Sequence, residues 1–409
     1  MVIVDLFSGA GGLTFGFYYK LINGEFVESH NSFVFANEYD KNAAAAFKKN
    51  YSQIHMENCD IKDLTEEKVK ELLKNKSVDL IIGGPPCQSF STVGQRQFDD
   101  KAKLYVEYLR MISIVKPKMF LFENVKGLLS MREVFYKKDS NGDIIYEYTN
   151  TENKTSKKPR KKPVVDHHGE KIMDIIKKQF EELGYTIYYK LFNAVNFGVP
   201  ENRERVFIVG VRNDINIEQK LQSPDIKPII TIKEAISDLP IVGENEEKQK
   251  YDVEPQNDYQ KLMRGSCKQI TQHYCGEYGD KIRTVIEHVR QGEGKNNFNK
   301  LVNAGEVSEE YRLTSGYANT YGRLVENQPS PTITNNMTTP SALRCIHYSQ
   351  NRALTPREGA RIQSFPDWYQ FDGKKEHVTK QIGNAVPPLL AISLARQIEQ
   401  MLEEASNNE

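Results

Sequence analysis

The sequence predicts an α/β fold with a mostly parallel sheet, and three observations support this prediction. Short apolar runs alternate with longer amphipathic segments over residues 1–130. A glycine-rich turn separates the first apolar run from the first amphipathic segment, and the same alternation returns near the carboxyl end after an irregular stretch. Strands that alternate with helices favour a parallel sheet covered on both faces, so we expect a doubly wound fold.

The expected elements can be assigned in chain order. Val2–Phe7 predicts a buried strand, followed by the glycine turn and a helix from about Leu13 to Leu21. The next expected elements are strand Phe33–Asn37, helix Lys41–Asn50, strand Val78–Ile82, helix Leu104–Val115 and strand Met119–Phe122. Two later runs, Thr186–Val195 and Arg205–Val211, predict strands that are close enough in sequence to pair at one edge of the sheet.

Two stretches interrupt this pattern and define the expected domains. Residues 131–168 are polar and contain the basic run 157–162, which is either a phosphate-facing loop or, the reading we favour, a solvated insertion. Asn141-Gly142 predicts a tight hairpin turn within this insertion. Residues 213–325 have mixed polarity and predict a smaller irregular domain. We therefore expect a first domain over 1–212, a separate domain over 213–325, and a return to the first domain over 326–409.

That return should be helical. Thr355-Pro356 predicts a helix start with proline at the first position, and Pro387–Leu402 predicts the last helix.

Composition limits the functional classes. The chain has 55 Lys and Arg against 55 Asp and Glu, so net charge alone does not indicate a nucleic-acid partner. No apolar run is long enough to span a membrane, and the first motif begins at the amino terminus, which predicts a cytoplasmic protein. The five scattered cysteines predict free thiols, and the spacing of Cys267, His273 and Cys275 fits no zinc pattern, so no metal is expected.

The turn Asp5–Gly12 has the features of a cofactor cradle. Its glycines allow a sharp turn and a close approach of the backbone to a ligand. Glu38 follows the second strand, where an acid typically accepts hydrogen bonds from ribose hydroxyls, and Asp60 follows a third apolar stretch. Each acid alone is more simply a helix cap or a surface charge. Together with Phe7, which can stack on a purine, they predict an adenosine pocket.

Cys87 is the predicted nucleophile. It follows two prolines that stiffen the chain after strand Val78–Ile82, at the carboxyl end where open α/β sheets bind ligands. Most cysteines are inert and buried, but a turn this constrained is poorly suited to filling a core. A thiolate at this position would attack an electron-poor carbon, and the polar stretch 88–103 predicts a loop that closes on the substrate.

Glu123 is the predicted acid that assists this thiol. It follows three apolar residues at the end of the neighbouring strand, where a low dielectric would raise the pKa of its carboxyl and let it donate a proton. A thiol and an acid at adjacent strand ends suit conjugate addition to a pyrimidine, with sulfur adding at C6 while the acid supports N3. Arg203 and Arg205 would share one face of an extended run, a geometry that suits a carbonyl oxygen or a phosphate.

With these residues, the sequence resembles the cytosine-5 DNA methyltransferase family, notably the modification enzymes of bacterial restriction systems. The resemblance covers essentially the whole chain. It rests on Asp5–Gly12, Glu38, Asp60, Pro85-Pro86-Cys87-Gln88, Glu123-Asn124-Val125, Arg203, Arg205 and 381–387. It implies a mostly parallel seven-stranded sheet with a reversed edge strand, and S-adenosyl-L-methionine as cofactor. The implied cofactor contacts are Phe7, Ser8, Gly9, Ala10, Gly11, Gly12, Glu38, Tyr39, Asp60, Ile61, Pro85, Leu104, Asn384 and Val386.

The resemblance also implies how the enzyme meets its substrate. Cys87, Glu123, Arg203 and Arg205 would act on a cytosine flipped out of double-stranded DNA, and 213–325 would be the target recognition domain. Asn384 would bring the last helix back onto the first domain. A cognate restriction endonuclease is the expected functional partner, and the bacterial cytosol or nucleoid the expected location.

The sequence departs from the family pattern at two positions. Glu201 replaces a usual glutamine and would place a negative charge near the DNA, and Lys101 replaces a common arginine. Two other functions remain open at this point, a tRNA cytosine-5 methyltransferase and an inactive DNA-binding homologue. The complete set of Cys87, Glu123 and Arg205 argues against the inactive homologue. The tRNA branch tends to have a Cys-Phe-Thr signature, which is not evident in this sequence.

Overall fold

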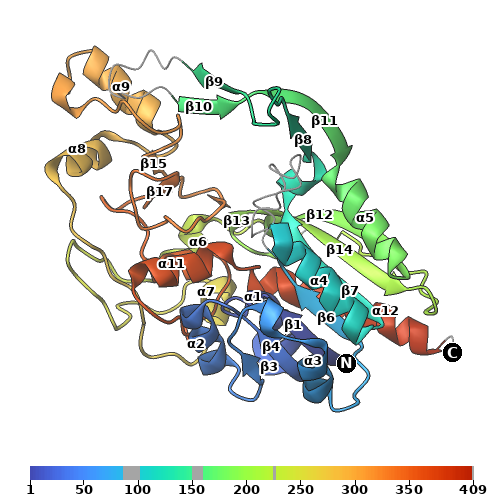
Figure 1. Cartoon of the computed structure of the whole chain (residues 1–409). Coiled ribbons are helices and arrows are strands. Elements are labelled where there is room, and N and C mark those ends of the chain that lie inside the picture. The colour runs from blue at the N-terminus through green and yellow to red at the C-terminus, as the bar shows by residue number, and fades with distance from the viewer. Residues whose placement is uncertain (86–101, 150–159, 224–226, 408–409) are drawn as a thin grey trace. The chain divides into compact units, whose positions relative to one another are not determined.

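The structure is a computed structural model that describes residues 1–85, 102–149, 160–223 and 227–407 (Figure 1). The chain divides into two compact units. The first contains Met1–Asp60, Phe192–Glu204 and Ile217–Glu409, and the second contains Ile61–Leu191 and Arg205–Asn216. These units cut across the expected domains, because residues 217–325 stay with the first unit. The division into 1–212, 213–325 and 326–409 therefore stays a prediction.

Seven strands form one sheet in the order β12-β14-β7-β6-β1-β4-β5. Their bounds are β1 Val2–Leu6, β4 Ser32–Asn37, β5 Met56–Glu57, β6 Leu80–Gly83, β7 Met119–Val125, β12 Tyr185–Asn193 and β14 Glu204–Arg212. The pairs β1–β4, β4–β5 and β6–β7 are parallel, whereas β14 is antiparallel to β7. The mostly parallel seven-stranded sheet is confirmed. The expectation of a reversed edge strand needs a correction, because the reversed strand β14 lies one place in from the edge strand β12.

In the first unit, helix α1 (Gly12–Tyr18) ends earlier than the sequence predicted. The chain turns at Asn23 and Gly24, which both have positive φ, and forms the antiparallel hairpin of β2 (Tyr19–Ile22) and β3 (Glu25–Glu28). An Asn-Gly pair suits this kind of turn. The sequence therefore indicated the hairpin, but the predicted helix was extended to Leu21 and overlapped its first strand. Helix α2 (Lys41–Asn50) has the predicted bounds, since Asp40 accepts hydrogen bonds from the free backbone N–H groups of Asn42 and Ala43.

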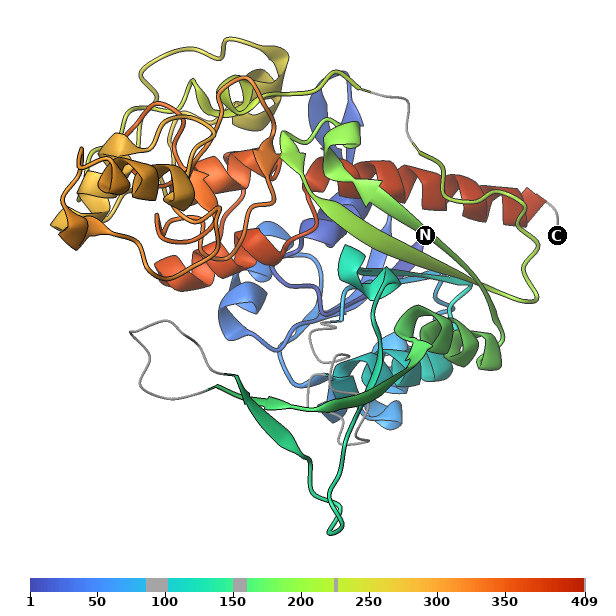
Figure 2. The same ribbon diagram turned by 90° about the horizontal axis from the view of Figure 1, so that it is seen from above.

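The last helix packs back on the amino-terminal part of the chain, as the resemblance implied, and it does so against the first helix. Helix α12 (Pro388–Asn407) lies beside α1 (Figures 1 and 2). A Cβ on Gly16 would lie 2.0 Å from the backbone carbon of Ala391, so only glycine permits this approach. The two ends of the chain therefore build one core.

The second unit buries an aromatic cluster on one face of β7. Helices α3 (Glu66–Leu73), α4 (Ala102–Val115) and α5 (Ile172–Glu182) belong to it, together with the 3₁₀ turns Ile61–Asp63 and Lys126–Leu129. Phe180 of α5 packs against Phe120, and Tyr108 of α4 packs edge-on against Phe122. Phe120 and Phe122 share a face because side chains alternate along a strand. This packing fixes β7, and with it the residues at its carboxyl end.

The polar insertion forms a β-ribbon in the second unit. Strand β8 (Arg132–Tyr136) pairs with β11 (Val165–Lys171), and β9 (Tyr146–Thr149) pairs with β10 (Arg160–Pro163) (Figure 2). The predicted turn at Asn141-Gly142 is confirmed. Gly142 has φ +85°, and the Asp139 carboxylate accepts hydrogen bonds from the N–H groups of Asn141 and Asp143. Residues 157–159 of the basic run lie outside the described residues, and 160–162 belong to β10.

The rest of the first unit is built from short elements, as expected for 213–325. Its helices are α6 Ile232–Ile236, α7 Asp258–Arg264, α8 Asp280–His288, α9 Lys295–Asn303, α10 Pro356–Ile362 and α11 Lys375–Asn384. Its short strands are β13 Glu201–Asn202, β15 Gly322–Arg323, β16 Ser330–Pro331 and β17 Arg344–Ile346, and it has 3₁₀ turns at Ala194–Phe197 and Glu309–Tyr311. A small apolar core that includes Val285, Phe298 and Val302 supports α8 and α9.

Helix α10 begins as predicted and anchors the irregular segment. Thr355 and Glu358 form a capping box, with Pro356 at the first position. The fully buried Arg361 of α10 bonds Asp238 and Asp367 at the same time. Asp238 also accepts from Arg264 of α7, so one buried ion network joins α7 to α10. No helix in the described parts of the chain is long and apolar enough to cross a membrane.

Candidate active site

The glycine-rich turn after β1 has the backbone of a ligand cradle. Phe7, Gly9 and Gly11 all have positive φ, at 56°, 58° and 95°. A Cβ on Gly11 would lie 2.3 Å from the ring of Tyr51, whereas a Cβ on Gly9 would meet nothing within 4 Å. Packing against Tyr51 therefore requires a glycine at position 11. At position 9 the positive φ favours glycine, and the space beside it is open. This is the arrangement expected where a backbone approaches a ligand closely.

Two tyrosines hold this turn in place, and neither was identified from the sequence. Tyr51 donates its hydroxyl hydrogen bond to the carbonyl of Gly11 at 2.8 Å, and Tyr369 donates to the carbonyl of Ala10. Both tyrosines are fully buried. Only folding brings Tyr369 to the amino-terminal turn, so no local pattern marks it.

The segment after α11 also meets the turn. A Cβ on Gly12 would lie 2.5 Å from the carbonyl oxygen of Val386. Val386 is buried, while Asn384 at the end of α11 is exposed. The predicted return of this segment to the glycine turn is thus present in the first unit.

Glu38 lies against the glycine turn. Its carboxylate accepts hydrogen bonds from the N–H of Gly9 at 2.9 Å and from the N–H of Asp40 at 2.7 Å. Burial raises the pKa of Glu38, and these two backbone bonds act in the opposite direction. Tyr39 beside it is 75% exposed, an aromatic surface without cover in the described residues. Glu38 and the turn therefore form one rigid surface.

Asp60 follows a segment that is fastened to β4. The side-chain amide of the buried Asn37 donates to the carbonyl groups of Glu57 at 3.0 Å and Cys59 at 3.1 Å. Asp60 itself is half-buried, as is Phe7. Backbone donors, an aromatic ring and two carboxylates are the groups that suit an adenosine moiety, so the first unit fits the implied cofactor.

The second unit carries the predicted acid and one predicted arginine in direct contact. The guanidinium Nε of Arg205 lies 3.0 Å from Oε1 of Glu123, and both side chains are largely buried. A Cβ on Gly84 would lie 2.9 Å from Oε2 of Glu123, so glycine at 84 leaves room for the carboxylate. Glu123 thus faces the segment that leads to the nucleophile motif.

Asn124 is a positioning residue that the sequence analysis quoted but did not assign. Its side-chain amide donates to the carbonyl of Pro85 at 3.2 Å, and its side-chain oxygen accepts from the N–H of Val125. It therefore fastens the start of the Pro-Pro-Cys segment to the end of β7. Ile61 and Leu104 also lie in this unit, in the first 3₁₀ turn and in the first turns of α4.

Arg203 does not have the predicted role. Its side chain is fully buried, and its guanidinium donates to the carbonyl groups of Ile333, Gly383 and Ala385 in the first unit. It therefore positions backbone and does not face a substrate. The extended-run argument failed because the side chain turns into the core.

The prediction that Glu201 places a negative charge near the DNA is also wrong. The Glu201 side chain is fully buried, accepts from the N–H of Ile333 at 2.6 Å and lies 3.6 Å from Arg203, so it adds no charge to a DNA-facing surface. Cys87 and Lys101 lie outside the described residues.

The comparisons with known proteins decide the family. The C-5 cytosine-specific DNA methylase family matches residues 1–142 and 162–400. The chain belongs to this family. The unmatched residues 143–161 fall within the β-ribbon insertion. The chain is therefore a DNA cytosine-5 methyltransferase, and the β8–β11 pair of the ribbon lies inside the matched residues.

Curated relatives agree over nearly the full length. The type II methyltransferase M.DdeI of Desulfomicrobium norvegicum is 33% identical over 98% of this chain and 89% of its own. The type II methyltransferase M.AgeI of Thalassovita gelatinovora is 30% identical over 98% and 99%.

Solved structures support the fold. A proposed DNA modification methyltransferase from an E. coli prophage covers 98% of this chain and 99% of its own, with a TM-score of 0.69 and 23% identity. The S. pombe Dnmt2 methyltransferase has a TM-score of 0.56 and 13% identity over 98% and 99%. At these identities the two structures support the fold of this methyltransferase but do not indicate its substrate.

Proposed function

We propose that this methyltransferase modifies C5 of a flipped cytosine in a specific sequence of double-stranded DNA through a covalent bond between Cys87 and C6. The contact between Arg205 and Glu123, beside the segment that leads to Cys87, is the observation that carries the proposal. It gives the acid a fixed position, which general acid catalysis requires.

The first unit supplies most of the residues that would hold S-adenosyl-L-methionine. Glu38 and the turn from Phe7 to Gly12 would bind the ribose and amino-acid portions, and Asp60 the adenine amine. Tyr39, Ile61, Pro85, Leu104, Asn384 and Val386 complete the proposed contacts. When bound, the cofactor supplies an electrophilic methyl group.

The residues of this chain prepare the cytosine. The Cys87 thiolate forms the S–C6 bond, and the π pair of the C5–C6 double bond forms a C4–C5 double bond. The C4–N3 π pair moves onto N3, which takes a proton from Glu123. Arg205 holds the Glu123 carboxyl in position throughout. C5 becomes nucleophilic as a result. After methylation, loss of the C5 proton to a base and cleavage of the S–C6 bond restore the C5–C6 double bond and the thiolate, and N3 returns its proton to Glu123.

The biological role in this proposal is protection of DNA from a cognate restriction endonuclease. Two type II methyltransferases at 30% identity or more over 98% of the chain support it. Residues 213–325 would select the sequence by contacts to base edges in the major groove. Such an enzyme would work in the bacterial cytosol or nucleoid.

A trapping experiment tests the covalent step. Purified protein is incubated with cofactor and duplex DNA that contains 5-fluorocytosine, because fluorine at C5 blocks the final elimination. We expect a complex that survives denaturing electrophoresis with the wild-type chain and disappears with Cys87→Ala. Cys59→Ala is the matched control and should still form the complex.

Two outcomes would contradict the proposal. A stable complex with Cys87→Ala would remove the assigned nucleophile. Labelled methyl transfer to tRNA but not to duplex DNA would remove the assigned substrate. Bisulfite sequencing of DNA from a host that expresses the protein then gives the modified site.

A further inference from the structure

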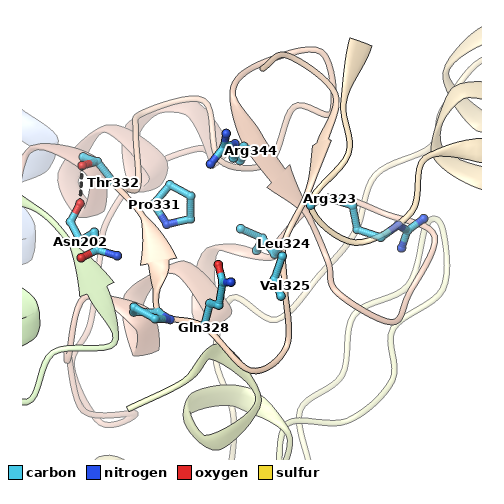
Figure 3. Close-up of a pocket in the computed structure, with 10 residues that line it drawn as sticks. Asn202, Arg323, Leu324, Val325, Gln328, Pro331, Thr332 and Arg344 are labelled. Atoms are coloured by element: carbon cyan, nitrogen blue, oxygen red, sulfur yellow. Dashed lines mark hydrogen bonds between the residues drawn. The ribbon is translucent and has the colours of Figure 1, made fainter. Parts of the chain in front are cut away.

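A cavity of about 350 Å³ lies in the first unit, apart from the cofactor cradle (Figure 3). Its lining residues are Asn202, Gly292, Arg323, Leu324, Val325, Gln328, Pro329, Pro331, Thr332 and Arg344. Apart from Gly292, they come from the short β13–β16 pair, the β15–β17 pair and the residues that adjoin these strands. None of these lining residues is acidic, and four of them carry N–H donors on their side chains.

Three of these four donors face the cavity. Figure 3 shows Arg344 and Gln328 pointing toward its middle from different walls, while Asn202 lies at the opposite end. All three side chains are exposed. The Thr332 hydroxyl donates to the backbone carbonyl of Asn202 at 2.8 Å, which joins β13 to β16 on that wall. The cavity therefore presents amide and guanidinium donors to solvent.

The stem of Arg344 passes over a glycine of the neighbouring strand. A Cβ on Gly322 would lie 2.5 Å from Cγ of Arg344, so glycine lets the arginine stem cross the β15–β17 pair. In the described part of the chain, no carboxylate oxygen lies within 4 Å of its guanidinium. Most other arginines of the segment, such as Arg312 with Glu309, do have such a partner.

Arg323 adds a second charge that no described carboxylate compensates. Its guanidinium points away from the cavity and donates to the carbonyl groups of Val289, Ile286 and His347, and to Asn351 (Figure 3). Arg323 is 7% exposed, and burial lowers its pKa, yet an arginine stays charged at neutral pH. The Arg323 charge therefore lies behind the cavity wall, and Arg344 is the arginine that is exposed at the cavity.

We propose that this cavity binds a phosphodiester of the DNA backbone, with Arg344 as the charged contact and Gln328 and Asn202 as neutral donors. The proposal rests on the proposed action on double-stranded DNA. Such a contact would position the DNA without selecting its sequence, because a phosphate contact fixes register but carries no sequence information. Arginine suits this role, since its planar donors match two phosphate oxygens.

The salt dependence of DNA binding tests it. Binding of wild type, Arg344→Gln and Arg344→Lys to fluorescent duplexes is measured between low and high salt, with and without the mapped methylation site. We expect Arg344→Gln to bind both duplexes about ten-fold more weakly. Its salt slope should fall by about 0.9, the value for one lost phosphate contact, and Arg344→Lys should keep the slope. The control Arg396→Gln, an exposed arginine on α12 outside residues 213–325, should match the wild type.

A methylphosphonate scan identifies the phosphate. Each phosphate of the bound duplex is replaced by a neutral methylphosphonate in turn. One position should weaken wild-type binding and leave Arg344→Gln unaffected. The phosphate assignment would be overturned if no position behaved in this way. It would also be overturned if Arg344→Gln weakened binding only to the duplex with the methylation site, or if the cavity bound free phosphate but not DNA. If wild type itself neither binds nor methylates duplex DNA, the proposed function fails and not this site alone.

Discussion

Arg205 and Glu123 are diagonal neighbours on the antiparallel pair of β14 and β7. Phe207 lies directly opposite Glu123, and Arg205 lies two residues before Phe207, so all three share one face. The Nε–Oε1 distance of 3.0 Å follows from this register. The reversed direction of β14 is what brings an arginine near its amino end to the carboxyl end of β7.

Removing the acid should abolish most of the chemistry without affecting the fold. Glu123→Gln keeps the size of the side chain but cannot donate a carboxyl proton, and general acid–base groups contribute about 10² to 10⁴-fold to rate. We expect a fall in kcat of that size with little change in DNA affinity. Labelled methyl transfer under saturating DNA measures it. Glu181→Gln, on the exposed face of α5, should behave as wild type, and equal activity of the two variants would exclude the assigned role.

Glu38 should control cofactor affinity. In Glu38→Gln the charged acceptor for the Gly9 N–H is lost, together with a charged partner for ribose hydroxyls. Hydrogen bonds to charged groups contribute about 1.5–3 kcal/mol, so the cofactor Kd should rise about ten- to hundred-fold. Isothermal titration with S-adenosyl-L-methionine measures this. Glu25→Gln on the exposed hairpin is the control, and an unchanged Kd in Glu38→Gln would contradict the cradle.

The contact between the first and last helices predicts a steep packing penalty. In Gly16→Ala the new methyl group would collide with the Ala391 backbone, which cannot move aside as a flexible side chain would. Overpacking typically costs about 1–3 kcal/mol, so the thermal midpoint should fall clearly. Gly279→Ala has open space around its Cβ and an ordinary φ of −73°, and should be nearly neutral. Similar midpoints for the two variants would argue against this packing.

The elements predicted best were those whose signals are local. Apolar runs marked β1, β4 and β7, and Thr355-Pro356 marked the start of α10. The hairpin Tyr19–Glu28 was missed because its aromatic and apolar residues continued a helical pattern past the true end of α1. The Asn23-Gly24 pair indicated a turn and should have been given more weight than the helical pattern.

The candidate site also contains residues that local sequence signals identified and residues that they did not. Glu38 and Glu123 were identified because each follows an apolar strand, and strand ends are where such sheets bind ligands. Tyr369, which fastens the glycine turn, has no local pattern that marks it. The true role of Arg203 depends on carbonyl groups from residues 333–385, which only folding brings to it.

A buried histidine should make stability depend on pH. His347 is 2% exposed, and its Nδ1 accepts hydrogen bonds from the N–H groups of Ser349 and Gln350, so the ring is neutral in the fold. Burial lowers the pKa of His347 to about 4; Glu358 opposes this shift, whereas Arg352, Arg323 and His273 reinforce it. The unfolded chain then binds a proton that the folded chain does not.

Stability should therefore be full above pH 6.5 and fall as the pH drops toward 4, by about 3 kcal/mol. His347→Asn keeps an acceptor near Nδ1 but cannot be protonated, so its stability should change less across this window, although it starts lower because the smaller side chain leaves a gap. Denaturant unfolding at pH 7.5, 6.0 and 5.0 measures the difference. His168→Asn, on the exposed strand β11, should follow the wild-type slope. If His347→Asn followed that slope as well, the loss of stability in acid would have to come from other groups.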